Sequence, residues 1–306
     1  MTATDATTIR VGGYAPKEAV HSRALDHFVD FITSHSDGRV KVDVLYNVMD
    51  EGRPMAELLD MVVSGELTWC YYSTSYLGST VPTVDALEIP FLFSSLADAH
   101  ASLDGAFGDT ISDAIAAVHP IEVLGFWDNG FRHLTNSRHP IRTPADCDGL
   151  SIRLQPNRVH AALVEAWGME PVLAELSEGI RLIASGAVDA QENPLANTAA
   201  YGVDHEHITM SSHLYGARGL LAGRAQMAML DDATADLVRR GARSAIEFQR
   251  AAAQQYELEL RARFDAEGRT IIDLTPDERR AFRDAASSVI DEARAAVPGV
   301  LLEHVQ

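Results

Sequence analysis

The sequence predicts an α/β fold divided into two lobes, and three observations lead to this prediction. Strands alternate with amphipathic helices over residues 8–126, which is typical of a largely parallel sheet covered by helices. The same alternation starts again near Thr143. A helical stretch then covers residues 231–266, with no proline and one internal glycine, Gly241. A helix of that length would span ~50 Å, which exceeds one small lobe, so we expect it to bridge both.

Hydrophobic periodicity places the elements of the first lobe. Residues 39–46 alternate valine and leucine with charged side chains, which is the period of a half-buried strand. A predicted helix over residues 54–64 ends at Gly65, because glycine commonly terminates helices. The other predicted elements are strands over 8–12, 67–72 and 122–126, and helices over 17–34 and 95–118.

Capping signals place the elements of the second lobe. Thr143 precedes Pro144 and Asp146, the pattern of an N-cap, a first-turn proline and a first-turn acid. Thr275 and Glu278 match a capping box in front of a final helix. The other predicted elements are helices over 157–167 and 177–185, and strands over 149–154 and 187–191.

Composition restricts the class of protein and its partners. The chain has 306 residues, of which 46% are hydrophobic and 23% charged, as in ordinary soluble globular proteins. No apolar run approaches the ~20 residues of a membrane helix. The formal net charge of -19 argues against nucleic acid or an anionic membrane surface as a partner. It remains compatible with a small anionic ligand, because screening confines surface fields to about 8 Å.

Cysteine usage and the N-terminus leave the cellular compartment open. Cys70 and Cys147 lie among apolar neighbours, so buried free thiols are expected in preference to a disulfide. Residues 1–5 show neither the basic nor the apolar part of a secretory signal. The chain is therefore expected to be either a mature exported form, its signal peptide removed, or a protein kept in the cytoplasm.

Several short strings occur together in one order along the chain. Residues 89–93 read I-P-F-L-F, and residues 125–136 read G-F-W-D-N-G-F-R-H-L-T-N. Residues 140–153 read P-I-R-T-P-A-D-C-D-G-L-S-I-R, and residues 186–194 read G-A-V-D-A-Q-E-N-P, followed by Thr209 and His213. Together these strings resemble the DctP-type solute-binding proteins of TRAP transporters, and the likeness covers nearly the whole chain.

The resemblance implies a fold, a function and partners. The fold is periplasmic-binding-protein-like of type II, with two α/β lobes, a hinge and a long lobe-spanning helix. Lobe I would comprise residues 1–125 and 215–250, and lobe II residues 126–214 and 251–306. The protein would lie in the periplasm or otherwise outside the cytoplasm, as a monomer without a cofactor or a metal site of its own, and a cation that bridges ligand and protein in the cleft is an open alternative. It would close its lobes on a small organic acid and deliver that acid to the membrane subunits of a TRAP transporter.

Three residues carry the family's binding pattern. Arg153 matches the arginine that pairs with the ligand carboxylate, Arg132 a second cleft arginine, and Asn193 an asparagine at the same end of the ligand. A guanidinium fits this role because its two parallel N–H groups match a carboxylate. Because successive side chains of a strand point to opposite faces, Arg153 lies on one face and its two apolar neighbours lie on the other. A buried arginine there needs an acid, and the alternatives to a ligand acid are Asp189 and Glu192 of the same lobe.

Several candidate residues also have a structural alternative. Arg132 could instead be a surface or hinge arginine, and Asn193 a turn residue before a proline. Further ligand contacts are expected from side chains at strand ends or at the lobe crossover. For two of these residues, Trp127 and His213, packing in the core is the alternative. These further candidates are Trp127, Asp128, Tyr72, Ser73 and His213.

An enzyme and a ligand-sensing domain are the alternatives to a solute-binding protein. An enzyme acting on a small carboxylate would need a catalytic constellation, and the chain has no nucleophile elbow, phosphate loop or dinucleotide fingerprint. His205 and His207 are two residues apart, which is not the spacing of a helical zinc pair. A ligand-sensing domain of the same fold is the second rival, because fold alone does not determine function.

Overall fold

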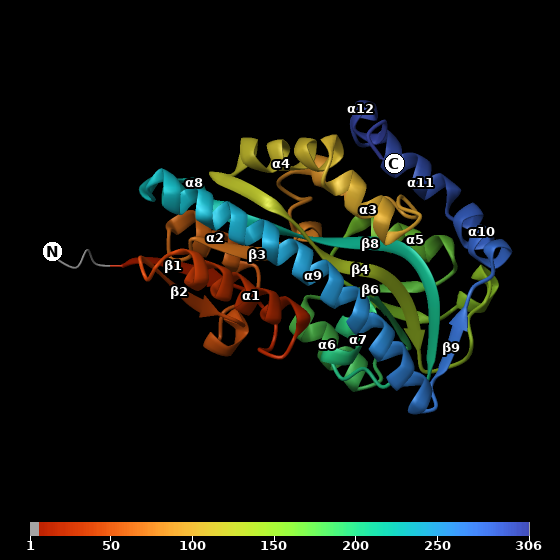
Figure 1. The fold of residues 1–306 in the computed structure, drawn as a ribbon. Helices are drawn as coiled ribbons and strands as arrows, with labels where there is room; N and C mark the ends of the chain where they lie inside the picture. The colour runs from red at the N-terminus through yellow and green to blue at the C-terminus, as the bar shows by residue number, and fades with distance from the viewer. Residues whose placement is uncertain (1–5, 306) are drawn as a thin grey trace, which may run out of the picture. The chain divides into compact units, whose positions relative to one another are not determined.

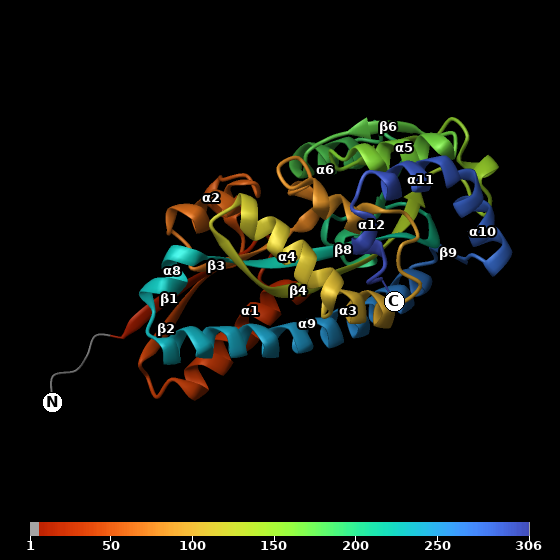
Figure 2. The same cartoon turned by 90° about the horizontal axis from the view of Figure 1, so that it is seen from above.

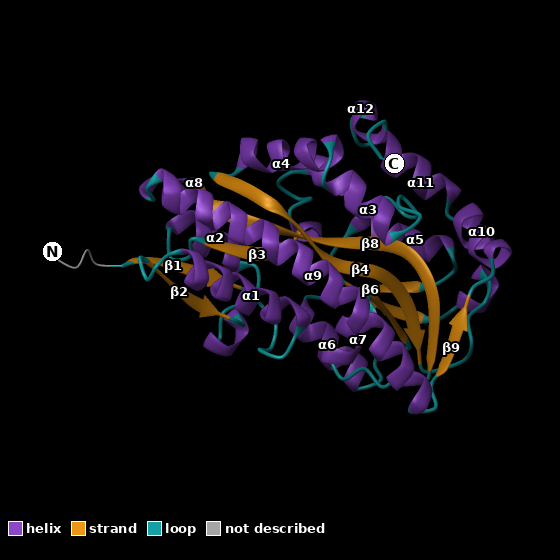
Figure 3. Cartoon of the chain, in the orientation of Figure 1, coloured by secondary structure: helices purple, strands orange, loops and turns teal. Residues whose placement is uncertain are grey.

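The computed structural model describes residues 6–305. Residues 1–5, which were considered above for a signal segment, and residue 306 lie outside the described residues. Helices and strands alternate along most of the chain (Figure 3). The chain forms two units, and each is described by itself. Unit 1 consists of Met1–Val81, Leu103–Asp128 and Ala217–Gln254, and unit 2 of Pro82–Ser102, Asn129–Gly216 and Gln255–Gln306.

Three long elements contribute residues to both units. They are β4 (Ile121–Asn136), β8 (His207–Gly223) and α9 (Asp232–Ala266). The lobe boundaries expected from the sequence stay a prediction. They differ from these units at Pro82–Ser102, which belongs to unit 2.

Unit 1 builds its part of the sheet from short parallel strands. β1 pairs in parallel with β2 and with β3, and β3 pairs antiparallel with the C-terminal part of β8. The core contains Phe28, whose ring meets the Trp69 ring edge-on at 4.9 Å between centroids. The other elements of unit 1 are β1 (Thr7–Gly12), α1 (Val20–His35), β2 (Val40–Leu45), η1 (Val48–Glu51), α2 (Glu57–Ser64), β3 (Trp69–Ser73), η2 (Thr74–Tyr76), α4 (Ala106–Val118) and α8 (Arg224–Met229).

Unit 2 contains a second set of paired strands. β7 pairs antiparallel with β4 and in parallel with β5, and β5 pairs in parallel with β6. β9 pairs in parallel with the N-terminal part of β8. Its other elements are η3 (Pro82–Glu88), α3 (Leu96–Leu103), η4 (Pro144–Cys147), β5 (Ser151–Leu154), α5 (Arg158–Ala166), β6 (Glu170–Leu173), α6 (Leu176–Ala184), β7 (Ala190–Asn193), α7 (Leu195–Ala200), β9 (Thr270–Asp273), α10 (Pro276–Ala285), α11 (Ser287–Ala295) and α12 (Gly299–Leu302).

The C-terminal helices are anchored on the core of unit 2. α11 packs beside α5 (Figure 2). The indole Nε1 of Trp167 donates a hydrogen bond of 2.9 Å to the carbonyl oxygen of Phe282, and the two rings meet edge-on at 5.1 Å. Phe282 is fully buried, so this contact fixes which face of α10 turns inward.

The long helix expected over residues 231–266 is present as the continuous helix α9 (Figure 1). Its internal glycine, Gly241, has a packing reason. A Cβ atom there would lie 2.9 Å from Cε2 of Phe28 and 3.2 Å from Cδ1 of Ile32. The close approach of α1 to α9 within unit 1 therefore leaves no room for a side chain, which offsets the low helix propensity of glycine.

The structure corrects several predicted element boundaries. The strand expected over residues 122–126 continues to Asn136, and β8, β6 and β9 were not predicted at all. The extension of β4 carries Asp128, Arg132 and His133, and these polar residues interrupt the alternation that marks a half-buried strand. The final helix is divided into α10, α11 and α12. Among the residues that the structure describes, no helix has both the length and the apolar character to cross a membrane.

Candidate functional site

Arg153 lies in the interior of unit 2. β5 is short, and Ile152, Arg153 and Leu154 are at most 3% exposed, so both faces of the strand are covered. The Nη2 atom of Arg153 donates a hydrogen bond of 2.7 Å to the carbonyl oxygen of Ala174. Helix α6 passes so close that a Cβ atom on Gly179 would lie 2.1 Å from Nε of Arg153. The position of this guanidinium is therefore set by the backbone of unit 2.

The two carboxylates considered as partners of Arg153 pair with other residues. Asp189 accepts hydrogen bonds of 3.0 Å from the backbone N–H and 2.7 Å from the hydroxyl of Ser151, and forms an ion pair with Arg138. Glu192 pairs with Arg132. Both sequence alternatives for Arg153 are thus engaged elsewhere, and its role toward a ligand stays a prediction.

Arg132 forms a buried ion pair with Glu192. The antiparallel register of β4 and β7 places Leu134 opposite Glu192, and so brings Arg132 near the same carboxylate. Arg132 donates from Nε and Nη2 to the carboxylate, with Nη2 2.7 Å from Oε1, and also donates to the Glu192 carbonyl oxygen at 2.9 Å. The two residues are 3% and 1% exposed. The surface position considered as an alternative is therefore wrong, whereas a direct ligand contact stays a prediction.

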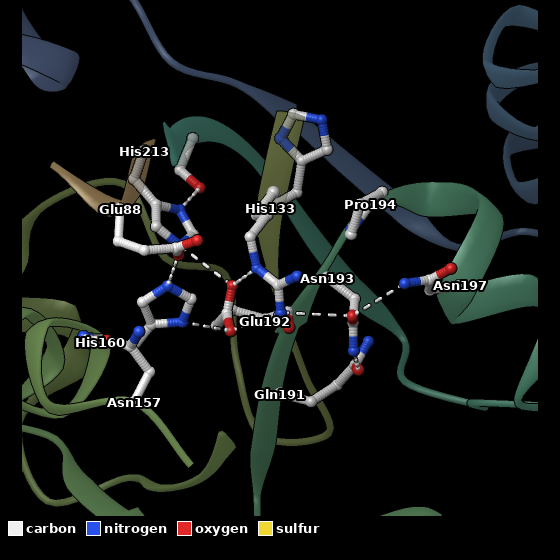
Figure 4. Close-up of polar contacts among 12 residues, drawn as sticks. Glu88, His133, Asn157, His160, Gln191, Glu192, Asn193, Pro194, Asn197 and His213 are labelled. Atoms are coloured by element: carbon white, nitrogen blue, oxygen red, sulfur yellow. Dashed lines mark hydrogen bonds and ion pairs between the residues drawn. The ribbon is translucent and has the colours of Figure 1, made fainter. Parts of the chain in front are cut away.

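Two histidines and a second carboxylate complete this cluster, which we call the Glu192 cluster (Glu88, Arg132, His160, Glu192 and His213). Figure 4 shows the side chains of Glu88, His160, Glu192 and His213 pointing toward one another. His160 Nε2 lies 2.6 Å from a carboxylate oxygen of Glu88, and His160 Nδ1 lies 3.5 Å from Glu192. His213 Nε2 is also 3.5 Å from Glu192, and its Nδ1 is 2.7 Å from the Ser211 hydroxyl. All five members are 3% exposed or less.

The electrostatics of the cluster follow from burial and pairing. Burial by itself raises the pKa of Glu192, but the charge of Arg132 and hydrogen bonds from His160 and His213 hold that pKa well below the usual range. Burial lowers the pKa of His160, yet the two carboxylates outweigh burial and raise it. Burial lowers the pKa of His213 to about 4, against the opposing effect of Glu192. The positive charges of protonated His160 and Arg132 therefore pair with the two carboxylates, and His213 is neutral near pH 7.

Asn193 ends β7 and extends the polar network. Its Oδ1 atom accepts hydrogen bonds of 3.3 Å from Arg132 Nη2 and from Asn197 Nδ2, and its own amide donates to Gln191 (Figure 4). Asn193 is 3% exposed. Asn193 is a strand residue, directly before Pro194, the N-cap of α7, so the alternative that Asn193 is itself a turn residue is wrong. Its contact with a ligand stays a prediction.

Unit 1 holds a separate group of aromatic residues around a buried arginine. Trp127 is fully buried, with its ring centroid 5.3 Å from Tyr71 and 6.0 Å from His21. The guanidinium of Arg218 lies over the rings of Tyr14 and Tyr71, at 4.7 and 5.4 Å from their centroids. Tyr71 accepts a hydrogen bond of 2.9 Å from the backbone N–H of Tyr14. The geometry of Trp127 fits the core-packing alternative.

The remaining candidates in unit 1 are buried at strand ends. Asp128 is 2% exposed, and its backbone N–H and carbonyl each form a hydrogen bond of 2.8 Å with the amide of Gln249. Tyr72 and Ser73 end β3 at 4% and 7% exposure, opposite Gly219 and Arg218 of β8. The unit thus brings Tyr72, Ser73 and Arg218 to neighbouring positions, while their ligand contacts stay predictions.

Sequence reasoning missed three buried charged residues. Arg218 is a single charge in the otherwise small and apolar run 216–223. His160 shares the buried face of α5 with Leu163 and Val164, at helical spacing. Glu88 is the last residue of η3 and stands between Leu87 and Ile89. A charge within an apolar pattern was the available signal, because such a group must find a partner when buried. No group of three metal-ligating side chains converges among residues 6–305.

Known protein families and relatives match nearly the whole chain. Residues 11–296 match the DctP family, described as bacterial extracellular solute-binding protein, family 7. A solute-binding protein of Verminephrobacter eiseniae is 29% identical over 274 residues, which are 89% of this chain and 81% of the relative. The 2,3-diketo-L-gulonate-binding periplasmic protein of Escherichia coli is 28% identical, covering 76% of this chain and 68% of the relative.

Solved structures agree with this relationship. The sugar acid-binding protein of Advenella mimigardefordensis, in complex with galactonate, superimposes with a TM-score of 0.90 and 26% identity, covering 98% of this chain and 96% of that chain. The type II fold expected from the sequence is therefore confirmed, as is the resemblance stated above. Because the family match covers nearly the entire sequence, this chain belongs to the DctP family of bacterial extracellular solute-binding proteins.

Proposed function

We propose that this protein binds a small organic acid through Arg153 and supplies it to the membrane subunits of a TRAP transporter. The observation that carries the proposal is the buried guanidinium of Arg153, which the Ala174 carbonyl and α6 hold in one position. A guanidinium fixed in this way loses little freedom when it binds a carboxylate with both N–H groups. Closure of the lobes on the acid is expected from the family resemblance and stays a prediction.

Hydroxylated sugar acids are the first ligands to test. The Escherichia coli relative is named for 2,3-diketo-L-gulonate, and the Advenella protein holds galactonate. Both compounds combine one carboxylate with several oxygen-bearing carbons. Tyr72 and Ser73 of unit 1 would supply hydroxyl groups for such a ligand, and Arg132, Asn193 and His213 of unit 2 would surround its carboxylate end. Trp127 and Asp128 have the weaker claim to direct contact, since both are held by neighbours within unit 1.

Isothermal titration of the purified protein with galactonate, 2,3-diketo-L-gulonate and succinate tests the proposal. Arg153→Ala should weaken binding by ~2–5 kcal/mol, or roughly 30- to 4000-fold, because the carboxylate loses a desolvated charge partner. Arg153→Lys should restore only part of the affinity, since an ammonium lacks the planar fork. Arg181→Ala is the matched control, because Arg181 lies on α6 with a side chain 73% exposed.

Two results would contradict the proposal. One is that none of the three acids binds to the folded wild-type protein. The other is that Arg153→Ala binds an acid as tightly as the wild type does, which would make Arg153 structural. The transport role has its own readout. Proteoliposomes that contain the cognate membrane subunits should take up the acid only when this protein is added.

A further inference from the structure

A surface pocket of unit 2 is lined by none of the residues considered above for ligand binding. Its volume is about 450 Å3. Its walls come from the segment that follows η3, the end of β9 and one face of α10. The residues that line it are Phe91, Phe93, Ser94, Leu274, Pro276, Arg279, Arg280 and Arg283. Three guanidinium groups and two aromatic rings thus share one hollow.

The sequence of α10 explains why its arginines face the pocket. Pro276, Arg279, Arg280 and Arg283 recur at the spacing of one helical face. Phe282 is fully buried and anchored by Trp167, so the helix cannot rotate that face away. In an amphipathic helix this spacing usually places apolar residues on one face. In α10 the same spacing places arginines on the face that borders the cavity.

Arg279 is held in place by contacts that leave its charge uncompensated. Its Nη2 atom donates a hydrogen bond of 2.9 Å to the carbonyl oxygen of Ser212, and its guanidinium lies 5.7 Å from the ring centroid of Phe91. Both contacts orient the group, and neither contributes a negative charge. Burial lowers the pKa of Arg279, which agrees with a cation that has lost part of its water.

Three acidic residues near the pocket already have partners, and one of these partners, Arg280, itself lines the pocket. Asp277 pairs with Arg280 at 2.8 Å, and Asp273 pairs with Arg261. Asp98 accepts hydrogen bonds of 2.7 and 3.0 Å from the backbone and hydroxyl of Ser94. Within residues 6–305, neither Arg279 nor Arg283 forms an ion pair. Two arginines without an acidic partner therefore share one concave surface in a chain with a net charge of -19.

The backbone around the pocket is strained at two positions. Phe91 has a φ of 55° and Ser212 a φ of 46°, values that residues with a Cβ rarely adopt. The backbone N–H of Phe91 donates to the carbonyl oxygen of His213 at 2.9 Å, which holds the strained residue in place. Strain of this kind collects at sites that recognise ligands. Here it fixes an aromatic ring beneath Arg279 and a carbonyl group beside it.

We propose that this pocket is a second anion-binding site, which takes a carboxylate attached to a flat apolar body, as in an aryl carboxylate. Arg279 and Arg283 would hold the carboxylate, because guanidinium groups match its two oxygens. Phe91, Leu274 and Pro276 would contact the apolar body, and the aromatic ring prefers a flat partner. The site uses no residue of the proposed transport site, so either proposal can fail without the other.

The test uses 4-fluorobenzoate as the probe, followed by fluorine NMR. The protein carries Arg153→Ala, so that binding at the proposed transport site does not contribute. We expect saturable binding with a Kd of about 1 mM, as suits so small a ligand. Adding Arg279→Gln and Arg283→Gln should raise that Kd at least about tenfold, because both charge-assisted contacts are lost. Arg294→Gln, an exposed arginine on α11, should leave the Kd unchanged.

Single substitutions guard against a folding artefact. Arg279 supports the backbone at Ser212, so Arg283→Gln alone, at an exposed position, should also weaken binding several-fold with unchanged circular dichroism. The proposal is overturned if 4-fluorobenzoate does not saturate the Arg153→Ala protein, or if the arginine substitutions leave its Kd unchanged. Inorganic phosphate that competes as strongly as the probe would overturn the role assigned to the apolar wall.

Discussion

At the residue scale, the Glu192 cluster gathers a guanidinium and two imidazoles around one buried carboxylate. The string that ends in Glu192-Asn193-Pro194 was recognisable, and Arg132 was predicted beside the ligand. The pairing of β4 with β7 joins Arg132 to Glu192, while His160 comes from α5, His213 from β8 and Glu88 from η3. No local pattern predicts that β4, α5 and β8 meet at the carboxylate of Glu192, or that η3 brings Glu88 to His160. Removing one partner of such a buried pair typically costs about 3–5 kcal/mol, because the other charge is left uncompensated.

His160 makes the stability of the protein depend on pH. Its pKa in the folded protein is raised by Glu192 and Glu88 above the value of about 6.5 that an unfolded chain shows. Between these two pKa values the folded state binds more protons than the unfolded state, so stability falls as the pH rises. The contribution is complete below about pH 6.5 and is lost as the pH passes the folded pKa. Urea unfolding at a series of pH values measures this slope.

Substitution of the histidine separates this effect from other titrations. His160→Gln should lower stability by about 3–5 kcal/mol at low pH, since Glu88 and Glu192 lose a cation, and should flatten the slope above about pH 6.5. His35→Gln, on the exposed end of α1, should keep the wild-type slope. His213 titrates near 4 and so acts outside this range. A slope that survives in His160→Gln would assign the proton to another group.

At the element scale, the long strands were the main failure of prediction and the helices the main success. β4 was expected to end at residue 126 and β8 was missed, because buried polar residues interrupt the period-2 pattern on which strand prediction depends. Those residues are tolerated only because tertiary partners satisfy them, as Gln249 does for the backbone of Asp128. The α9 boundaries were confirmed within one residue, since a long proline-free stretch needs no distant information.

The contact between α6 and β5 carries a prediction about ligand binding. Gly179→Ala would place a methyl group 2.1 Å from Nε and 2.6 Å from Cζ of Arg153. Arg153 can yield only by giving up its buried hydrogen bond to the Ala174 carbonyl oxygen, so we expect a loss of unfolding free energy of about 1–3 kcal/mol. The displaced guanidinium should bind galactonate at least about tenfold more weakly, because carboxylate recognition depends on its orientation. Titration calorimetry and urea unfolding of the same sample check both parts.

Ser177→Ala provides the matched control for this experiment. Ser177 lies on the same helix and is exposed, so its substitution should change neither affinity nor stability appreciably. Normal affinity in Gly179→Ala would show that α6 does not position Arg153. A loss of stability far larger than expected would show instead that the arginine cannot move and that the contact belongs to the folded core.

At the scale of the whole molecule, each unit contains one buried thiol. Cys70 lies in unit 1 and Cys147 in unit 2, and both are free, as the sequence led us to expect. Burial raises the pKa of Cys70, with its Sγ atom 3.8 Å from the Leu58 carbonyl oxygen. Burial, followed by the charge of Asp146, raises the pKa of Cys147 to about 12. Each thiol can therefore report the opening of its own unit.

Neither thiol should react with Ellman's reagent while the protein is folded. The thiolate is the reactive species, and burial suppresses both its formation and its access. Labelling of the native protein should be slower than that of the urea-unfolded chain by a factor of at least about 1000. Cys147→Ala then isolates the opening of unit 1, and Cys70→Ala that of unit 2. Rapid labelling of either single-cysteine protein would contradict the buried position of that thiol.

The sequence by itself determined the α/β class, the family and the long helix, because these depend on local periodicity, capping and strings that survive divergence. It also identified Arg153, Arg132 and Asn193 as a group. Only the tertiary structure decided what each of them touches: Arg132 and Asn193 share a network with Glu192, and Arg153 lies against Gly179. The arginine-lined pocket on α10 likewise appeared only in three dimensions. The physical reason is that a buried charged residue needs a partner, and the sequence shows no more than this need. Strand register and helix packing determine which residue becomes that partner.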